Sequence, residues 1–309
     1  MLELMVYAGH YDCYGKCEEV LKKFTSLEVS PSQIFRVTNN VSEELKSEDH
    51  NSERILQPVS NKDYLYIEVD GSMIHTRKNE EPWKEVKLGR IFRGEDCMNP
   101  NTDASHLEQS HYVGHFGKSA DFCVKMDKVI DSYGDLKDRM VFLSDGAPWI
   151  REWISDRYPF AVSILDFYHA MGYFYEFADK AFPNSPAEKQ QWVDCQQALL
   201  LESNVDTVLD NIKLTQAKEE DRKKLITYCQ NNKKRMQYGQ YRKIGCGIIG
   251  SGAIESSHRT VIQKRMQLAG QRWSIKGAKN MLRLRIISMN NQWAKVINAV
   301  KMPTLARSA

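Results

Sequence analysis

The sequence has no long hydrophobic run. No apolar stretch approaches the roughly 18 consecutive residues that a membrane-spanning helix needs, and the opening MLELMVYAGHYD lacks the basic and apolar segments of a secretion signal. The seven cysteines are odd in number and thinly spread, which suits free thiols in a reducing compartment better than a disulfide framework. These absences predict a cytoplasmic protein with no membrane partner.

Several catalytic motifs are also missing. The stretch GCGIIGSG at 245–252 lacks the Lys-Ser/Thr ending of a Walker phosphate loop, and no G-x-S-x-G nucleophile elbow is present. Cys13 and Cys17 have too few companions for a zinc site. With 309 residues, 42% of them hydrophobic and 27% charged, the chain is nonetheless long and apolar enough for one large globular domain or two ordinary ones.

Acidic residues are scarce in the last quarter of the chain. Residues 230–309 contain sixteen Lys or Arg and a single acid, Glu255, although the net charge of the whole chain is only +3. Clustered Lys and Arg bind phosphate by releasing condensed counterions, so a polyanion is the expected partner of this segment. From charge alone, solvated helix faces remain an alternative.

The chain predicts a mixed α/β sheet with helices on its faces. Three strands come first and are expected to form hairpins, then a helix at 119–133, a strand, a helix beginning at Pro148, and a further strand. Helical sequence dominates from 167 to 241, and two more helices are expected, one running from Glu255 to about 268 and one over 273–297. The five expected strands are 64–70, 86–92, 111–116, 139–145 and 160–166.

Three acidic residues are placed for chemistry. Asp70 and Asp145 each stand where an apolar run ends and a glycine begins, and strand ends are where open α/β sheets gather functional side chains. An Asp-Gly pair after a strand is also ordinary turn chemistry. Glu255 opens a helix after a glycine-rich stretch, and one lone acid does little to offset so many basic residues. Three carboxylates suit two Mg²⁺ (or Mn²⁺) ions about 3.5–4 Å apart, as in phosphoryl transfer on nucleic acid.

Four sequence blocks carry a resemblance to a known family. In these blocks the sequence resembles DDE transposases of bacterial insertion sequences, specifically the Kra-type group and its Mutator-like relatives. These transposases have a ribonuclease H-like fold. The blocks are VDGSMIHTR followed by WKEVKLGRIF, FLSDGAPWI, ILDFYHA and GSGAIESSHRTVIQKRMQLAGQRW. The resemblance implies that Asp70, Asp145 and Glu255 are the catalytic, metal-binding triad.

The same family has a Cys/Asp-x-x-His signature after its second Asp. Asp166-Phe-Tyr-His169 resembles it, which implies that Asp166 reaches the catalytic site and that His169 bonds to it or to the phosphate. A histidine after a strand is otherwise often structural. The long gap between Asp145 and Glu255 matches the helical domain that such relatives insert there.

The basic residues after Glu255 are expected to contact DNA. Lys264 and Arg265 lie more than two helical turns beyond Glu255, so they are better placed along a DNA backbone than at the metals. Arg259 and Arg272 complete the basic set. Trp273 either packs in the core or stacks on an unpaired base.

The resulting hypothesis is a DNA transposase acting on double-stranded element ends and target DNA, as a homo-oligomer associated with the bacterial nucleoid. Four regions follow: a helical lead-in (1–60), the first part of the core (61–166), an all-helical insertion (167–244) and a completing segment with basic helices (245–309). The lead-in is shorter than the end-reading region of relatives, so a truncated copy is expected. Two alternatives remain open: a nuclease of the same fold without strand transfer, and a catalytically silent DNA-binding remnant.

Overall fold

A five-stranded mixed sheet forms the centre of the computed structural model, which describes residues 1–46, 57–77, 81–100, 102 and 105–301. The strand order is β5-β2-β1-β6-β7. β1, β2 and β5 pair antiparallel as successive hairpin strands, whereas β1, β6 and β7 are parallel. The strands are β1 (Leu65–His75), β2 (Trp83–Arg93), β5 (His111–His115), β6 (Met140–Ser144) and β7 (Val162–Leu165). The predicted mixed α/β architecture is confirmed, and it is compatible with a ribonuclease H-like fold.

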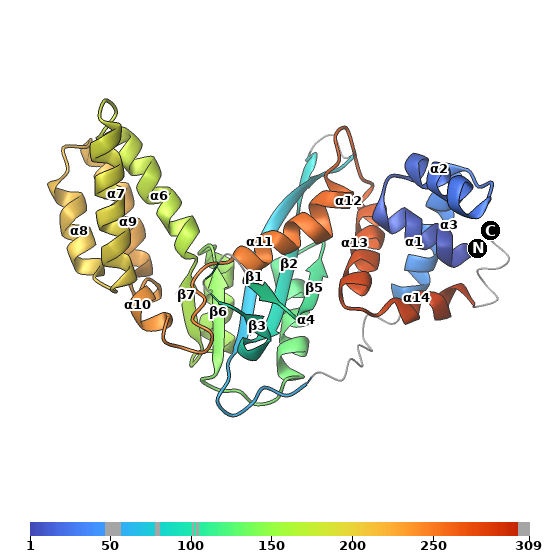
Figure 1. Ribbon diagram of the computed structural model, residues 1–309, viewed down its shortest axis with the longest axis horizontal. Coiled ribbons are helices and arrows are strands. Elements are labelled where there is room, and N and C mark those ends of the chain that lie inside the picture. The colour runs from blue at the N-terminus through green and yellow to red at the C-terminus, as the bar shows by residue number, and fades with distance from the viewer. Residues whose placement is uncertain (47–56, 78–80, 101, 103–104, 302–309) are drawn as a thin grey trace.

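Helices cover both faces of the sheet (Figure 1). Side chains alternate along a strand, so Ile67 and Val69 of β1 pack in one core with α4 (Ser119–Asp131) and α5 (Pro148–Arg157). Ile74 faces the other way, into a second core. That second face is covered by α11 (Gly252–Ser257), the π-helix His258–Gln263, α12 (Lys264–Met266) and α13 (Ile275–Met289).

Within the described residues, only helices occupy the chain between β7 and the glycine-rich stretch before α11. They project from the β7 side of the sheet (Figure 1), and a long aromatic helix, α6, joins them to it through Phe167 and Phe174. These helices are α6 (Phe167–Ala181), α7 (Pro186–Leu201), α8 (Val205–Leu214), α9 (Glu219–Asn232), the 3₁₀ turn Lys233–Arg235 and α10 (Tyr238–Tyr241). They are the predicted all-helical insertion.

The N-terminal helices pack on the opposite side of the molecule (Figure 1). α1 (Leu2–Tyr11), α2 (Tyr14–Thr25) and α3 (Pro31–Glu44) share a core with α13 and α14 (Trp293–Val300). A capping box starts α3. The Ser30 side chain accepts a hydrogen bond from the Gln33 backbone amide, and the Gln33 side chain accepts one from the Ser30 backbone amide. The first and last helices of the described chain therefore form one body.

Local structure departs from the sequence prediction in three places. β1 continues five residues past Asp70, because β2 stays paired with it as far as His75. The helix expected over 273–297 is two helices, separated at Asn291 by a left-handed residue with φ 55°. Two short strands that were not predicted, Cys97–Met98 and His106–Leu107, pair with each other.

The polar connector expected after the N-terminal helices falls partly on residues 47–56, which lie outside the described residues. Across the part of the chain that is described, no helix is both long enough and apolar enough to cross a membrane.

Candidate active site

One face of β1 carries the first predicted catalytic residue. Glu68, Asp70 and Ser72 alternate onto the face that α11 and the π-helix cover. The Asp70 side chain is 35% exposed, and its Oδ1 accepts a 2.7 Å hydrogen bond from the Gly71 amide. The sequence placed Asp70 at a strand end, which is wrong; it lies in mid-strand, just beyond the residues that pair with β6.

Asp145 and Asp166 follow two neighbouring parallel strands. β6 ends at Ser144 and β7 at Leu165, and these two residues are paired in the sheet. Because the carboxyl ends of parallel strands meet at one edge of a sheet, Asp145 and Asp166 emerge side by side. The half-buried Asp145 accepts a 3.0 Å hydrogen bond from the Ala147 amide, which caps the turn into α5.

Asp166 joins two segments that are distant in sequence. Its side chain is 1% exposed. One carboxylate oxygen accepts from the His169 amide at 2.6 Å, which caps α6, and the other accepts from the Ser251 amide at 2.6 Å, just before α11. Both oxygens are thus engaged by backbone amides, so in the structure Asp166 holds the entry to the Glu255 helix. The His169 side chain is exposed.

Glu255 is exposed on α11 and interacts electrostatically with the other acids. Burial raises the pKa of Glu255, and the charges of Asp166 and Asp70 raise it further, against the effects of His169 and Arg259. Burial likewise raises the pKa of Asp70, and Asp145 adds to this. Residues from β1, the β6 edge, the β7 edge and α11 therefore share one acidic patch, defined here as Asp70, Asp145, Asp166 and Glu255.

The acidic patch has the chemistry of a site for hard divalent cations. Mg²⁺ and Mn²⁺ prefer carboxylate oxygens. Burial is the main cause of the raised pKa values of Asp70 and Glu255, and the neighbouring carboxylate charges add to it; a bound cation would relieve that repulsion. Among the described residues, no three His, Cys, Asp or Glu side chains are already close enough to form a metal site. Asp70, Asp145 and Glu255 fit the ion by donor type, and their side chains would have to move closer together to share it.

Two side chains of the sheet, the buried Glu68 and the partly buried Arg90, fix α11 on it. Burial raises the pKa of Glu68 to about 8. Glu68 of β1 is fully buried and accepts a 2.7 Å hydrogen bond from the Ile254 amide at the start of α11. Arg90 of β2 donates to the Ala253 carbonyl at 2.8 Å and to Ser257 Oγ at 3.3 Å. Neither contact was predicted from the sequence. Together they set the height and rotation of the helix that presents Glu255.

His258 is a site residue that the sequence reasoning missed. Its Nδ1 lies 2.6 Å from Ser72 Oγ and its Nε2 3.5 Å from Asp70 Oδ2. Burial lowers the pKa of His258 to about 4, so the ring is neutral near pH 7. This fits Ser72 donating to Nδ1, and Nε2 has no hydrogen-bond partner among the described residues. The available signal was its position three residues after Glu255, on the same side of the helix.

Arg235 connects the helical insertion to the strand ends beside Asp145. This side chain is 7% exposed. It donates to Ser144 Oγ at 2.9 Å and to Ser163 Oγ at 3.1 Å, on β6 and β7. The insertion is thereby fastened to the sheet edge that carries Asp145 and Asp166.

The structure corrects the expected DNA contact of Arg265, and it places Trp273 in the core, the first of the two roles expected for it. Arg265 is 1% exposed; its Nε donates to the Gly9 carbonyl at 3.0 Å, and its guanidinium lies between the rings of Tyr14 and Trp273. Trp273 is 6% exposed and donates its indole N–H to the Met266 carbonyl at 3.0 Å. The π-helix changes the phase of the residues after it, which turns Arg265 inward, so neither side chain is accessible to DNA.

Arg259, Lys264 and Arg272, the remaining residues of the expected basic set, are exposed. They lie on the π-helix, on α12 and in the segment after it. Their role in DNA binding stays a prediction.

Comparison with known proteins places the chain in a family. No curated protein matches the chain at a significant level. A family model, that of the Uncharacterised protein family (UPF0236), matches residues 2–302, which is nearly the whole chain. The protein therefore belongs to the UPF0236 family.

Proposed function

We propose that the protein is a DDE-type DNA transposase, which cuts DNA at the ends of a mobile element and joins the freed 3′ ends to target DNA. The supporting observation is the acidic patch: Asp70, Asp145 and Glu255 come from three separate elements of a ribonuclease H-compatible sheet, and the charge of Asp70 affects the pKa of Glu255. In the otherwise basic segment 230–309, Glu255 is the only acid.

In this proposal Asp70, Asp145 and Glu255 bind Mg²⁺ or Mn²⁺. When bound, a pair of such ions supplies activation of the attacking oxygen and stabilisation of the leaving oxygen. The protein's own contribution is a fixed geometry, because catalytic groups on rigid elements hold their positions best. The Gly71 amide orients Asp70 through a hydrogen bond, and His258, whose Nε2 lies 3.5 Å away, would limit the movement of the same carboxylate. Glu68 and Arg90 hold the helix of Glu255.

The exposed Arg259, Lys264 and Arg272 would bind the DNA backbone next to this patch. Their positive charges attract phosphate to a site whose carboxylates alone would repel it. Joining two element ends to one target needs two such sites, so the DNA-bound form is proposed to be a homo-oligomer.

The test is a cleavage and strand-transfer assay on the DNA that flanks the gene, with Mg²⁺ or Mn²⁺ present. Asp70→Ala, Asp145→Ala and Glu255→Ala should each abolish both reactions and leave DNA binding measurable. Glu19→Ala, which removes an exposed acid from α2 far along the chain, is the matched control and should be fully active. Cleavage that survives in the triad variants would contradict the proposal, and cleavage without joining would indicate a nuclease instead.

A further inference from the structure

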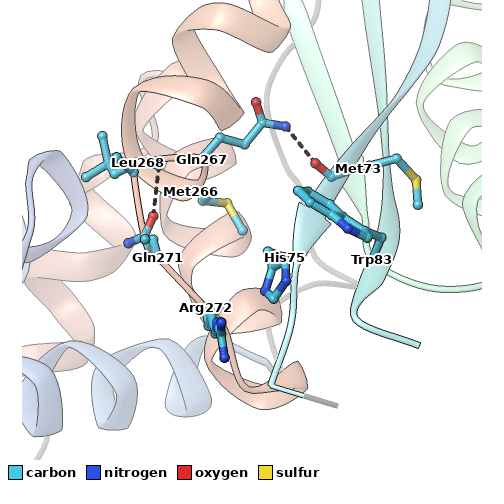
Figure 2. Close-up of a pocket in the computed structure, with 10 residues that line it drawn as sticks. Met73, His75, Trp83, Met266, Gln267, Leu268, Gln271 and Arg272 are labelled. Carbon is cyan, nitrogen blue, oxygen red and sulfur yellow. Dashed lines mark hydrogen bonds between the residues drawn. The ribbon is translucent and has the colours of Figure 1, made fainter. Parts of the chain in front are cut away.

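A pocket of about 530 Å³ lies away from the acidic patch, between the far end of the β1–β2 hairpin and the segment after α12 (Figure 2). This volume is within the range of about 300–1,000 Å³ that is typical of ligand sites. The hairpin contributes Met73, His75 and Trp83, and the other wall is residues 266–272.

Hydrogen bonds to backbone carbonyls connect the two walls of the pocket. Gln267 donates its side-chain amide to the Met73 carbonyl at 2.8 Å, as Figure 2 shows. The Trp273 amide donates to the His75 carbonyl at 2.9 Å, and the Arg77 amide donates to the Trp273 carbonyl at 2.9 Å. The segment therefore runs along the hairpin like an extra strand, and the pocket is present before any ligand binds.

The hairpin wall presents aromatic surface to solvent. The Trp83 side chain is 55% exposed, and the His75 ring meets it edge-on, with centroids 4.8 Å apart. Nδ1 of His75 is buried and has no hydrogen-bond partner among the described residues. Met73 is also half exposed. A flat ring, a thioether and an unsatisfied ring nitrogen together suit a planar ligand that carries polar edge groups.

Arginine side chains lie beside the pocket. None of the described residues that line it has an acidic side chain. Arg272 lies at its edge (Figure 2), and Arg77 donates its Nε to the Arg272 carbonyl at 3.4 Å. Among the described residues of the hairpin end, the acid Glu81 is paired with Lys84. A ligand with a phosphate attached to its planar part would match this distribution.

We propose that this pocket binds one unpaired base of the DNA substrate, stacked against Trp83, with Arg272 beside its phosphate. This inference rests on the proposed function and extends it. Met73 is three residues beyond Asp70, about 10 Å along β1, which a few nucleotides span. Alternation places Asp70 and Met73 on opposite faces of the sheet, and a strand that has left the duplex has the flexibility to pass from one face to the other.

The experiment uses the full chain in EDTA, where binding is measured without cleavage. The probes are a blunt DNA duplex and the same duplex with a short single-stranded overhang that contains 2-aminopurine. Trp83→Ala should weaken binding of the overhang about 5- to 100-fold, leave the blunt duplex unchanged and remove the 2-aminopurine fluorescence change. Trp83→Phe should keep most of the affinity.

Phe160→Ala, which removes an aromatic side chain that is 76% exposed elsewhere, is the matched control and should bind both probes normally. Equal affinity of Trp83→Ala and the parent protein for the overhang would overturn the inference, as would equal losses on both probes. These outcomes can be told apart from those of the catalytic test. If Trp83→Ala cleaves DNA and binds the overhang normally, only the pocket proposal is rejected. If Asp70→Ala still cleaves DNA, it is the proposed function that is rejected.

Discussion

The buried His10 side chain should make the folded protein less stable at acidic pH. This side chain is fully buried, its Nδ1 lies 2.5 Å from the Tyr7 carbonyl, and its Nε2 lies 3.2 Å from Ser288 Oγ on α13. Burial lowers the pKa of His10 from 6.5 to about 4, and the nearby Arg285 and Arg265 charges add to this. The ring is therefore neutral in the folded protein at pH 7.

The direction and size of this change in stability follow from the pKa of His10 in the unfolded chain and in the folded chain. Between pH 6.5 and about 4 the unfolded chain binds a proton that the folded chain does not, so stability is complete above pH 6.5 and falls as the pH drops through this window. One pKa unit corresponds to about 1.4 kcal/mol, so the loss attributable to His10 reaches about 3 kcal/mol at pH 4.

The assay is chemical denaturation of the parent protein and of His10→Asn between pH 7.5 and 4.5. Asn can keep the hydrogen bond to Tyr7 but does not titrate, so the stability difference between the two proteins should shrink steadily as the pH falls. His106→Gln, at an exposed position, is the control and should follow the parent curve. A constant difference between His10→Asn and the parent across the pH range would refute the reasoning.

Three further predictions concern the site and its surroundings. Millimolar Mn²⁺ should raise the melting temperature of the parent protein but not that of Asp70→Asn, since a ligand bound only by the folded state stabilises it; an equal rise in both would exclude Asp70 as a ligand. His258→Ala should slow cleavage about 10- to 100-fold with partial rescue by His258→Gln, and full activity of the Ala variant would show that His258 does not orient Asp70. Arg265→Ala should lower the free energy of unfolding by about 2–4 kcal/mol and leave the salt dependence of DNA binding unchanged. Lys264→Ala should reduce the slope of log K against log salt concentration by about one. The reverse pattern would contradict the burial of Arg265.

The sequence predicted the sheet well because its strands are short apolar runs between polar turns. Asp145 and Asp166 were placed correctly after β6 and β7. Asp70 was misplaced, because the local Asp-Gly signal does not reveal that β2 keeps pairing past it. In that case a long-range interaction outweighed local turn chemistry.

Side-chain roles were harder to predict than elements. Nothing in the local sequence shows that Glu68 and Arg90 form hydrogen bonds with a helix more than 160 residues away. The inward turn of Arg265 depends on a π-helix, whose single extra residue per turn has no reliable sequence signal. Such features arise from tertiary packing, so they become visible only when the chain is folded.

The two hydrogen bonds of Asp166 give the molecule a mechanical property. One carboxylate oxygen accepts a hydrogen bond from the first turn of α6, and the other accepts one from the residue before α11. The helical insertion and the helix of Glu255 are therefore connected through one side chain. A force on the insertion would therefore be transmitted through Asp166 to the segment that leads into α11. In the proposed transposase, DNA bound to the insertion would in this way affect the position of Glu255.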